Sequence, residues 1–149
     1  ARVAANSINK TPEILYSMFL SITLSGVLFM LLAATRAPAI IKYFGKLQAL
    51  KHSEDLRPNL PTASRNITDN YNHLFEQPTL FYALLTYIYL MQHVDATHLY
   101  LAWLYAALRI VHSLIQITSN NVSYRALIFL GSGACLILMI AKEVTFFLS

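Results

Sequence analysis

The chain has 149 residues, of which 56% are hydrophobic and only 12% are charged, with a formal net charge of +4 and a mean hydropathy of +0.50. Soluble domains carry about 25% charged residues, so this composition excludes an ordinary water-soluble domain. It also excludes disorder, because disordered chains are poor in apolar residues. The single cysteine excludes a disulfide framework and a cysteine-based metal site. The composition therefore predicts a small integral membrane protein.

Four apolar segments follow one another along the chain. A transmembrane helix needs roughly 20 predominantly apolar residues to cross about 30 Å of hydrocarbon. No segment shows the sustained alternation of polar and apolar residues that is typical of a strand. We therefore predict an all-α membrane protein, a four-transmembrane-helix bundle formed by one domain over residues 1–149. Its spans are expected at approximately residues 13–35, 70–92, 97–118 and 124–147.

A long polar segment, residues 36–69, separates the first two spans and carries six of the 11 Lys and Arg residues. Because Lys and Arg accumulate in cytoplasmic loops, this loop is expected in the cytoplasm and both termini on the opposite side. Residues 38–52 have apolar side chains at helical spacing, which predicts a short interfacial helix. The basic residues flank spans rather than form a stacking platform, which excludes nucleic acid as a partner. His93 and His98, near the short turn between spans 2 and 3, are expected to be solvated.

Polar and charged side chains interrupt spans 2, 3 and 4. Asn72 and Glu76 are four residues apart and therefore share one helix face. Span 3 carries a stripe at helical spacing that is too polar to face lipid: Tyr105, Arg109, His112 and Gln116. Arg125 opens span 4. Because a charge near the bilayer centre costs about 2.5–3.5 kcal/mol, these residues are candidates for a functional site.

Each of these residues also has a purely structural interpretation. Glu76 and Arg109 would neutralise one another across spans 2 and 3, as intramembrane charges usually do. His112 would form an ordinary interhelical hydrogen bond, and Arg125 would extend its charge to the membrane boundary. Pro78 is either a first-turn residue or a tolerated kink. No His, Asp and Glu grouping has the spacing of a metal site, so no metal is expected.

Two stretches carry a resemblance to a known family. Residues 70–82, NYNHLFEQPTLFY, resemble the helix-2 signature of bacterial members of the MAPEG family, the membrane-associated proteins in eicosanoid and glutathione metabolism. Residues 108–115, LRIVHSLI, resemble the helix-3 signature of that family. The length, the four-span layout and the basic first loop fit as well, so the resemblance covers nearly the whole chain.

The resemblance implies a homotrimer, here in the bacterial inner membrane, with glutathione as co-substrate between neighbouring subunits near the cytoplasmic face. Apolar substrates would arrive laterally from the membrane lipids. Arg125 matches by spacing an arginine that stabilises the glutathione thiolate in catalytic members. The residues implied in glutathione binding are Arg36, Asn72, Glu76, Arg109, His112 and Gln116.

The chain departs from the family pattern in helix 2 and in helix 3. Thr68 stands where the helix-2 pattern has an Arg, four residues before Asn72, and Glu76 follows Asn72 by four residues instead of three. Gln116 stands where catalytic members generally have a Tyr. These differences concern the ligand site rather than the fold.

The function implied is that of a glutathione-dependent transferase or peroxidase, with Arg125 as the catalytic residue and apolar electrophiles or lipid hydroperoxides as substrates. The alternative is a non-catalytic lipid-binding or accessory subunit of a membrane complex with the same fold. A transporter or channel is the weakest of the three interpretations, because the four spans show no internal repeat.

Overall fold

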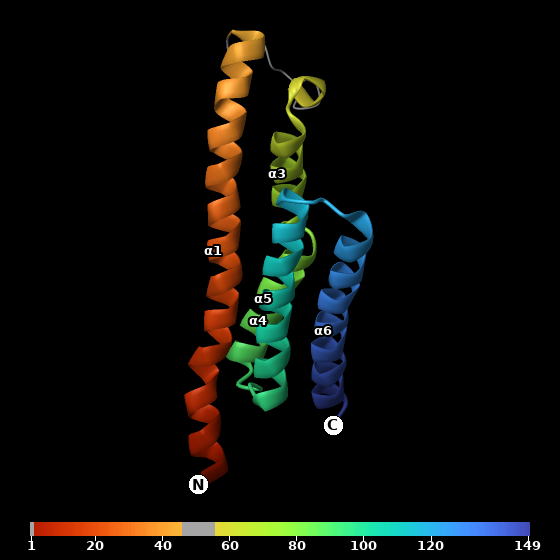
Figure 1. The fold of residues 1–149 in the computed structure, drawn as a ribbon. Coiled ribbons are helices and arrows are strands. Elements are labelled where there is room, and N and C mark those ends of the chain that lie inside the picture. Colours follow the sequence, from red (N-terminus) through yellow and green to blue (C-terminus); the bar gives the residue numbers. More distant parts are fainter. Residues whose placement is uncertain (1, 46–55) are drawn as a thin grey trace.

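The computed structural model describes residues 2–45 and 56–149. One long helix, α1 (Arg2–Phe44), runs the length of the molecule (Figure 1). At 1.5 Å per residue its 43 residues extend over about 65 Å. Ser17, Ser21 and Ser25 follow one another at intervals of four residues and bond to carbonyls of their own helix. Ser17 and Ser21 are buried, and the Ser25 hydroxyl lies 3.4 Å from the Tyr82 hydroxyl, so this small-residue face of α1 packs against the other helices.

The second apolar segment is divided into two helices. A 3-10 turn, η2 (Arg57–Asn59), precedes α3 (Thr62–His73), and α4 (Gln77–Leu90) follows after a break. Pro78 explains the break, because it has no N–H to donate to the carbonyl of Leu74 and its ring would clash with that carbonyl. Pro78 thus lies in the first turn of α4 rather than in a kinked continuous helix.

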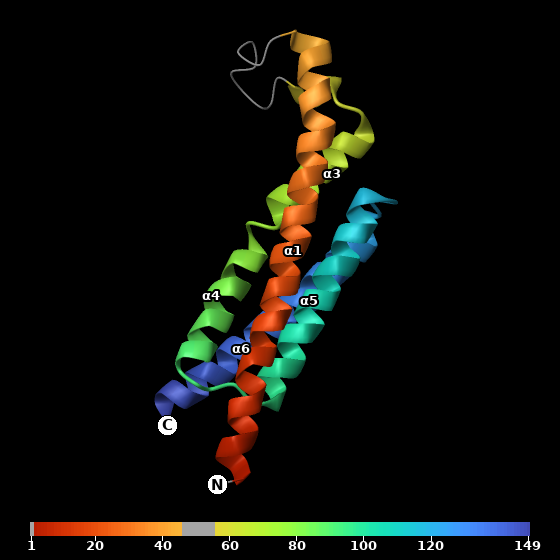
Figure 2. The same ribbon diagram turned by 90° about the vertical axis from the view of Figure 1, so that its left-hand side faces the viewer.

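Two further helices complete the chain, α5 (Ala96–Ile117) and α6 (Val122–Leu148). Asp95 caps α5 by accepting a hydrogen bond from the His98 backbone N–H at 2.9 Å. Asn121 caps α6 by accepting from the N–H groups of Ser123 and Tyr124. α1 and α6 lie on opposite sides of α3 and α5, and both ends of the chain lie at the same end of the molecule (Figures 1 and 2).

The apolar core joins α1, α4, α5 and α6 around Phe81 and Tyr105, whose rings stack at 4.1 Å. Next to this core α4 and α6 approach closely, where Ser132 donates to the Gln77 side-chain oxygen at 2.8 Å. Gly133 leaves room for the Gln77 side chain at this approach, because a Cβ atom there would lie 2.9 Å from Gln77 Nε2 and the amide would have to move.

Among residues 2–45 and 56–149, three helical segments are long and apolar enough to cross a membrane: Glu13–Lys42, Ala96–Ile117 and Val122–Leu148. The chain is therefore an all-helical integral membrane protein. Helix α4 has 14 residues and a length of about 21 Å, which is shorter than the hydrocarbon layer. The expected interfacial helix over residues 38–52 is only partly described: residues 38–44 continue α1, and residues 46–52 lie outside the described part.

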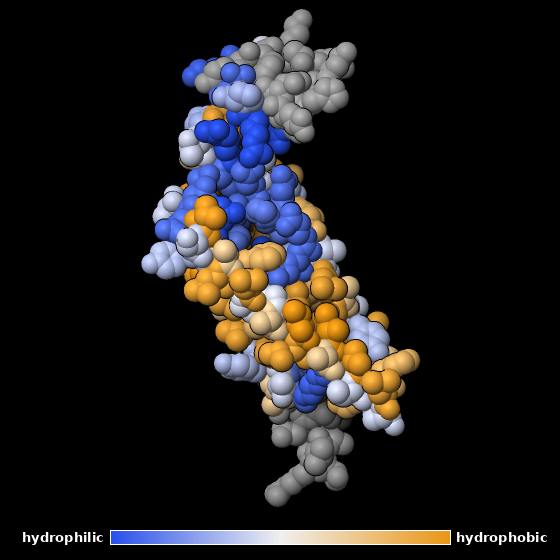
Figure 3. All heavy atoms as spheres, turned by 90° about the vertical axis from the view of Figure 1, so that its right-hand side faces the viewer, coloured by the Kyte–Doolittle hydropathy of each residue, from blue (hydrophilic) through white to orange (hydrophobic). Residues whose placement is uncertain are grey.

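Hydrophilic residues concentrate at the end of the molecule that holds α3, and apolar residues predominate over the middle of the face in Figure 3, with a smaller hydrophilic patch toward the other end. Large apolar side chains such as Leu127, Leu130, Ile137 and Phe147 are exposed along α6. An exposed apolar surface of this extent is expected of a protein surrounded by lipid.

Candidate functional site

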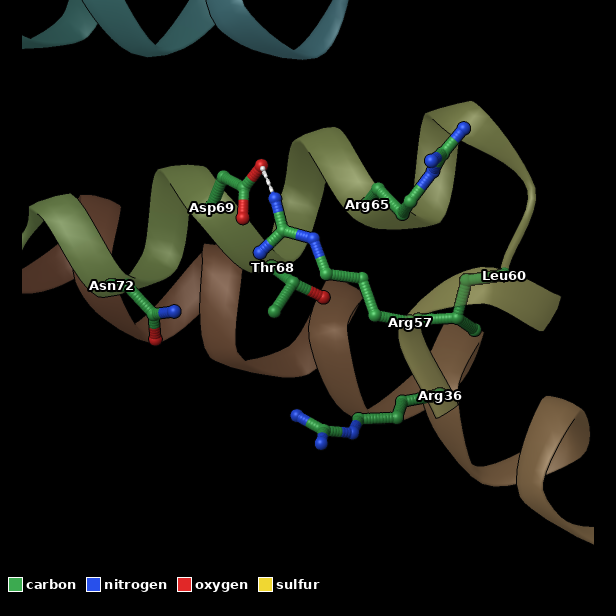
Figure 4. A pocket seen from close by; sticks show the side chains of 7 residues that line it. All are labelled: Arg36, Arg57, Leu60, Arg65, Thr68, Asp69 and Asn72. Carbon is green, nitrogen blue, oxygen red and sulfur yellow. Dashed lines mark hydrogen bonds and ion pairs between the residues drawn. The ribbon is translucent and has the colours of Figure 1, made fainter. Parts of the chain in front are cut away.

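A cationic pocket of about 150 Å³ lies between α1, η2 and α3 at the hydrophilic end (Figure 4). We call it the arginine pocket, and its lining residues are Arg36, Arg57, Leu60, Arg65, Thr68, Asp69 and Asn72.

Three guanidinium groups and one carboxylate line the arginine pocket, which gives it a formal charge of +2. Arg57 pairs with Asp69, with 3.1 Å between Nη2 and Oδ2. The Arg36 and Arg57 side chains extend along the groove between α1 and α3, whereas the Arg65 guanidinium points away from them (Figure 4). Because Arg57 is paired with Asp69 and Arg65 points away, Arg36 is the guanidinium that the pocket offers to an anion such as a carboxylate.

A second cavity, of about 220 Å³, lies where the α3–α4 break meets α5 and the start of α6. We call it the His73 cavity, and its lining residues are His73, Glu76, His112, Val122, Arg125, Ala126 and Phe129. It brings together Glu76, His112 and Arg125, three of the seven residues that the sequence predicts for the site. The lining thus combines one acid, one arginine and two imidazoles with apolar side chains from α6.

His73 and Glu76 form a hydrogen-bonded pair at the α3–α4 break, with 3.1 Å between His73 Nδ1 and Glu76 Oε2. The His112 ring lies edge-on to the His73 ring, with 6.4 Å between the centroids. His112 is 3% exposed, and its Nδ1 has no hydrogen-bond partner among the described residues. A buried imidazole without its own partner beside a cavity is a group that a ligand can satisfy.

Arg125 is held at the second cavity by the turn before α6. Its Nη1 donates to the side-chain oxygen of Asn120, and Asn120 Nδ2 in turn donates to Asn66 Oδ1 at 2.9 Å. Asn120 adopts a positive φ of 49°, a backbone conformation that Asn tolerates better than most residues. These hydrogen bonds connect the Arg125 guanidinium to α3 through the turn. Arg125 is therefore held in place, whereas a residue that only extends its charge to the membrane boundary would be free.

Arg109 lies in the interior and does not form the predicted ion pair with Glu76, although the structure describes both side chains. It is 1% exposed and donates through Nη2 to the His73 carbonyl at 3.4 Å, while its Nε and Nη1 have no partner among the described residues. The two side chains form no direct ion pair because the break between α3 and α4 turns Glu76 outward, where its side chain is 60% exposed and pairs with His73.

The polar stripe on α5 faces the interior, as predicted. All four of its members, Tyr105, Arg109, His112 and Gln116, are at most 3% exposed. Neither amide atom of Gln116 has a hydrogen-bond partner within the described residues. The stripe therefore brings into the interior several polar atoms that have no hydrogen-bond partner in the described part of the chain, and one of its members, His112, lines the His73 cavity.

Sequence reasoning missed Asn70, which joins α3 to α5. Its Nδ2 donates to the Ser113 carbonyl at 3.3 Å, and its Oδ1 accepts from the Ser113 hydroxyl at 3.1 Å. Because Asn70 is fully buried, these two hydrogen bonds fix the register of the two helices that carry His73 and His112. Asn66 and Asn70 share one face at a spacing of four residues, a signal that was present in the sequence.

The opposite end of the molecule holds a second group of ionisable residues, of which the sequence led us to expect His93 and His98 in solvent. His98 is fully buried, with its Nε2 3.2 Å from Glu143 Oε1, and His93 Nδ1 lies 2.7 Å from Glu143 Oε2. Lys142 pairs with Asp95. That expectation is wrong for His98, because the last turns of α6 cover the turn before α5. Within the part of the chain that the structure describes, no group of three His, Cys, Asp or Glu residues could hold a metal ion.

The predicted site residues thus occupy two sides of the protomer. Arg36 and Asn72 line the arginine pocket beside α1, whereas Glu76, His112 and Arg125 line the His73 cavity beside α6. α1 and α6 are separated by α3 and α5 (Figures 1 and 2).

Comparison with known proteins gives one match. The model of the MAPEG family matches residues 14–144, which include α3 to α5 and nearly all of the spanning part of α1 and α6. Comparisons with curated proteins and with solved structures found no match. Because the family model covers most of the sequence, including both cavities, the chain belongs to the MAPEG family.

Proposed function

We propose that this protein is a glutathione-dependent transferase or peroxidase of the membrane, which acts on apolar electrophiles or lipid hydroperoxides. The observation that carries the proposal is the His73 cavity, which Arg125 and the buried imidazole of His112 both line and where His112 Nδ1 has no hydrogen-bond partner among the described residues. Arg36 and Asn72 in the arginine pocket, together with Glu76, Arg109, His112 and Gln116, are the groups proposed to bind the tripeptide.

The proposed assembly is a homotrimer in which α3 and α4 together form the fourth membrane crossing. A tripeptide extends over about 10 Å, and the two cavities lie on opposite sides of α3 and α5. We therefore infer that one glutathione binds at a subunit interface, where the arginine pocket of one protomer faces the His73 cavity of its neighbour. The carboxylates would bind at Arg36, and the thiol would lie at Arg125.

The chemistry follows from the charge of Arg125. A thiol is nucleophilic only as the thiolate, and a guanidinium in a site of low dielectric constant lowers the thiol pKa by favouring the anion. Apolar side chains such as Val122 and Phe129 line the same cavity, so that an apolar substrate can approach the sulfur from the bilayer side.

The direct test compares the wild-type protein with Arg125→Ala in glutathione conjugation of chlorodinitrobenzene. Removal of one preorganised group that stabilises an anion in the transition state typically lowers the rate by about 100-fold or more. We expect that loss in kcat/KM, together with loss of the thiolate absorbance that glutathione produces on binding. If the wild-type protein shows neither turnover nor thiolate, the enzymatic function is excluded and the lipid-binding alternative gains.

A second experiment tests the shared site. Arg36→Ala and Arg125→Ala protomers, each inactive alone, are co-expressed with different affinity tags and purified as mixed oligomers. In a trimer whose sites take Arg36 from one chain and Arg125 from the next, one of the three sites in every mixed trimer is intact, or about a third of the sites after the homotrimers are removed. Partial recovery of activity is therefore expected. If each site lies within one protomer, the mixed oligomers remain as inactive as the parents.

A further inference from the structure

The pair formed by His73 and Glu76 has no role in the thiolate chemistry described so far. Both side chains line the cavity that Arg125 also lines. Glu76 is the N-cap residue of α4, yet its side chain caps no N–H of that helix. It lies instead 3.1 Å from His73 Nδ1. The acid is thus directed at an imidazole rather than at the helix end that it precedes.

The pair fixes the orientation of the imidazole. Because a carboxylate oxygen only accepts, His73 Nδ1 donates to Glu76 and carries the proton, which leaves Nε2 with a lone pair. The position of His73 is fixed from the other side as well, because Arg109 donates to its carbonyl. The charged and titratable groups around the ring are therefore Glu76, His112, Arg109 and Arg125.

We propose that His73, oriented by Glu76, is the general base that removes the proton of the glutathione thiol and returns it to the leaving group. This inference rests on the proposed function and adds to it a route for the proton. Arg125 stabilises the thiolate, but a guanidinium remains protonated and does not accept the proton. His73 is suited to this task because its side chain is 36% exposed, so that its proton exchanges with water as well as with the cavity.

With a hydroperoxide the steps balance as follows. His73 Nε2 takes the thiol proton, and the thiolate attacks the terminal oxygen of the hydroperoxide, which breaks the O–O bond. The sulfur is oxidised to a sulfenic acid, and the leaving alkoxide takes the proton from the His73 imidazolium to give the alcohol. The thiol of a second glutathione then reduces the sulfenic acid, and the products are the disulfide and water.

The experiment measures kcat/KM for a lipid hydroperoxide against pH, together with glutathione affinity from equilibrium dialysis. In His73→Gln, kcat/KM at neutral pH is expected to fall by about 100-fold, the typical contribution of general acid–base catalysis. Glutathione affinity is expected to stay near that of the wild type. The loss should shrink as pH rises, because the thiol then ionises without a base. Added imidazole should restore part of the activity of His73→Ala.

Two further variants make the result specific. His93→Gln is the matched control, because it removes the imidazole of another His–Glu pair at the far end of the molecule, and it should keep the wild-type pH profile. Glu76→Gln should lose less activity than His73→Gln, because the amide oxygen still accepts from Nδ1 but no longer stabilises the imidazolium.

The outcomes separate this inference from the proposed function. One outcome is that the wild-type protein binds glutathione and turns over while His73→Gln keeps the wild-type rate and pH profile. That result contradicts the role of His73 as general base and leaves the proposed enzymatic function intact. If the wild-type protein does not bind glutathione, both proposals are wrong. A folded His73→Ala that imidazole does not rescue also contradicts the general base.

Discussion

The two ends of the bundle differ in whether their ionisable side chains are paired with opposite charges. At the end that holds the α4–α5 turn, Glu143 contacts both His93 and His98, and Lys142 pairs with Asp95. At the end that holds α3, buried side chains of α5 have polar atoms without partners among the described residues: Arg109, His112 and Gln116. At one end acidic and basic side chains are paired within the chain, although His98 Nε2 and Glu143 Oε1, 3.2 Å apart, form no hydrogen bond among the described residues. At the other end Arg109 and the Gln116 amide have no acidic hydrogen-bond partner in the described part of the chain, and more of the polar atoms there lack hydrogen bonds.

This difference distinguishes a structural cluster from a binding site. A buried polar atom without a hydrogen-bond partner lowers the free energy of unfolding by about 1–3 kcal/mol relative to one with a partner. An ion pair within the chain avoids that cost and needs no ligand. The unsatisfied groups therefore weigh against the stability of the isolated protomer, and a ligand or a neighbouring protomer that pairs with them recovers part of this energy.

The largest effect on stability is expected at the compensated end, from Glu143→Leu. The change leaves the buried His98 Nε2 facing an apolar side chain, and removal of one partner of a buried pair costs about 3 kcal/mol or more. The midpoint of thermal unfolding in detergent measures the loss. The matched control is Glu13→Leu on the exposed side of α1, which is expected to change stability by less than about 0.5 kcal/mol. Equal effects of the two variants would contradict the structural role of Glu143.

An effect of the opposite sign is expected at the other end, from Gln116→Leu. Leucine fills a similar volume and removes two unsatisfied amide atoms, so the free energy of unfolding should rise by about 1 kcal/mol. Glutathione affinity should fall in the same variant if Gln116 contacts the ligand.

The control for this prediction is Gln77→Leu, because the Gln77 side-chain oxygen accepts a hydrogen bond from Ser132. Loss of that bond should lower the unfolding midpoint. If Gln116→Leu also lowers the midpoint of thermal unfolding, the Gln116 amide is hydrogen-bonded in the native assembly. The proposed difference between the two ends in the pairing of polar groups is then wrong.

The smallest effect is expected from acid at the Asp95–Lys142 pair. Burial raises the pKa of Asp95, but the Lys142 ammonium and the hydrogen bond from the His98 backbone outweigh it, so the pKa lies below its ordinary value of 3.8. A carboxyl group with a lowered pKa stabilises the fold fully above pH 3.8, and this contribution disappears as pH falls through the lowered pKa.

The pair is partly exposed, so its contribution is about 0.5 kcal/mol. The substitution Asp95→Asn retains a good N-cap residue and removes only the charge. We expect the unfolding midpoints of the wild type and the variant to differ slightly at neutral pH and to converge below the pKa of Asp95. If the two unfolding midpoints still differ at low pH, the effect comes from the N-cap hydrogen bond of α5 rather than from the charge of Asp95.

Much of the candidate site could be predicted from the sequence. Helical spacing placed Tyr105, Arg109, His112 and Gln116 on one face, and the cost of exposing such a face to lipid predicted its burial correctly. The role of Glu76 could not be predicted, because Pro78 breaks the helix and turns Glu76 away from Arg109. The burial of His98 was missed because it depends on α6, about 40 residues further along the chain, covering the turn.

By itself the sequence determined the class of the protein. Its apolar composition requires a membrane, and its apolar lengths and helical periodicity require helices, because these are properties of consecutive residues. Which polar groups are paired was decided only by the tertiary structure. Glu143 meets His98, Asn70 meets Ser113, and Glu76 turns to His73 rather than Arg109, since contacts between helices depend on where each helix breaks and how it is rotated against its neighbours.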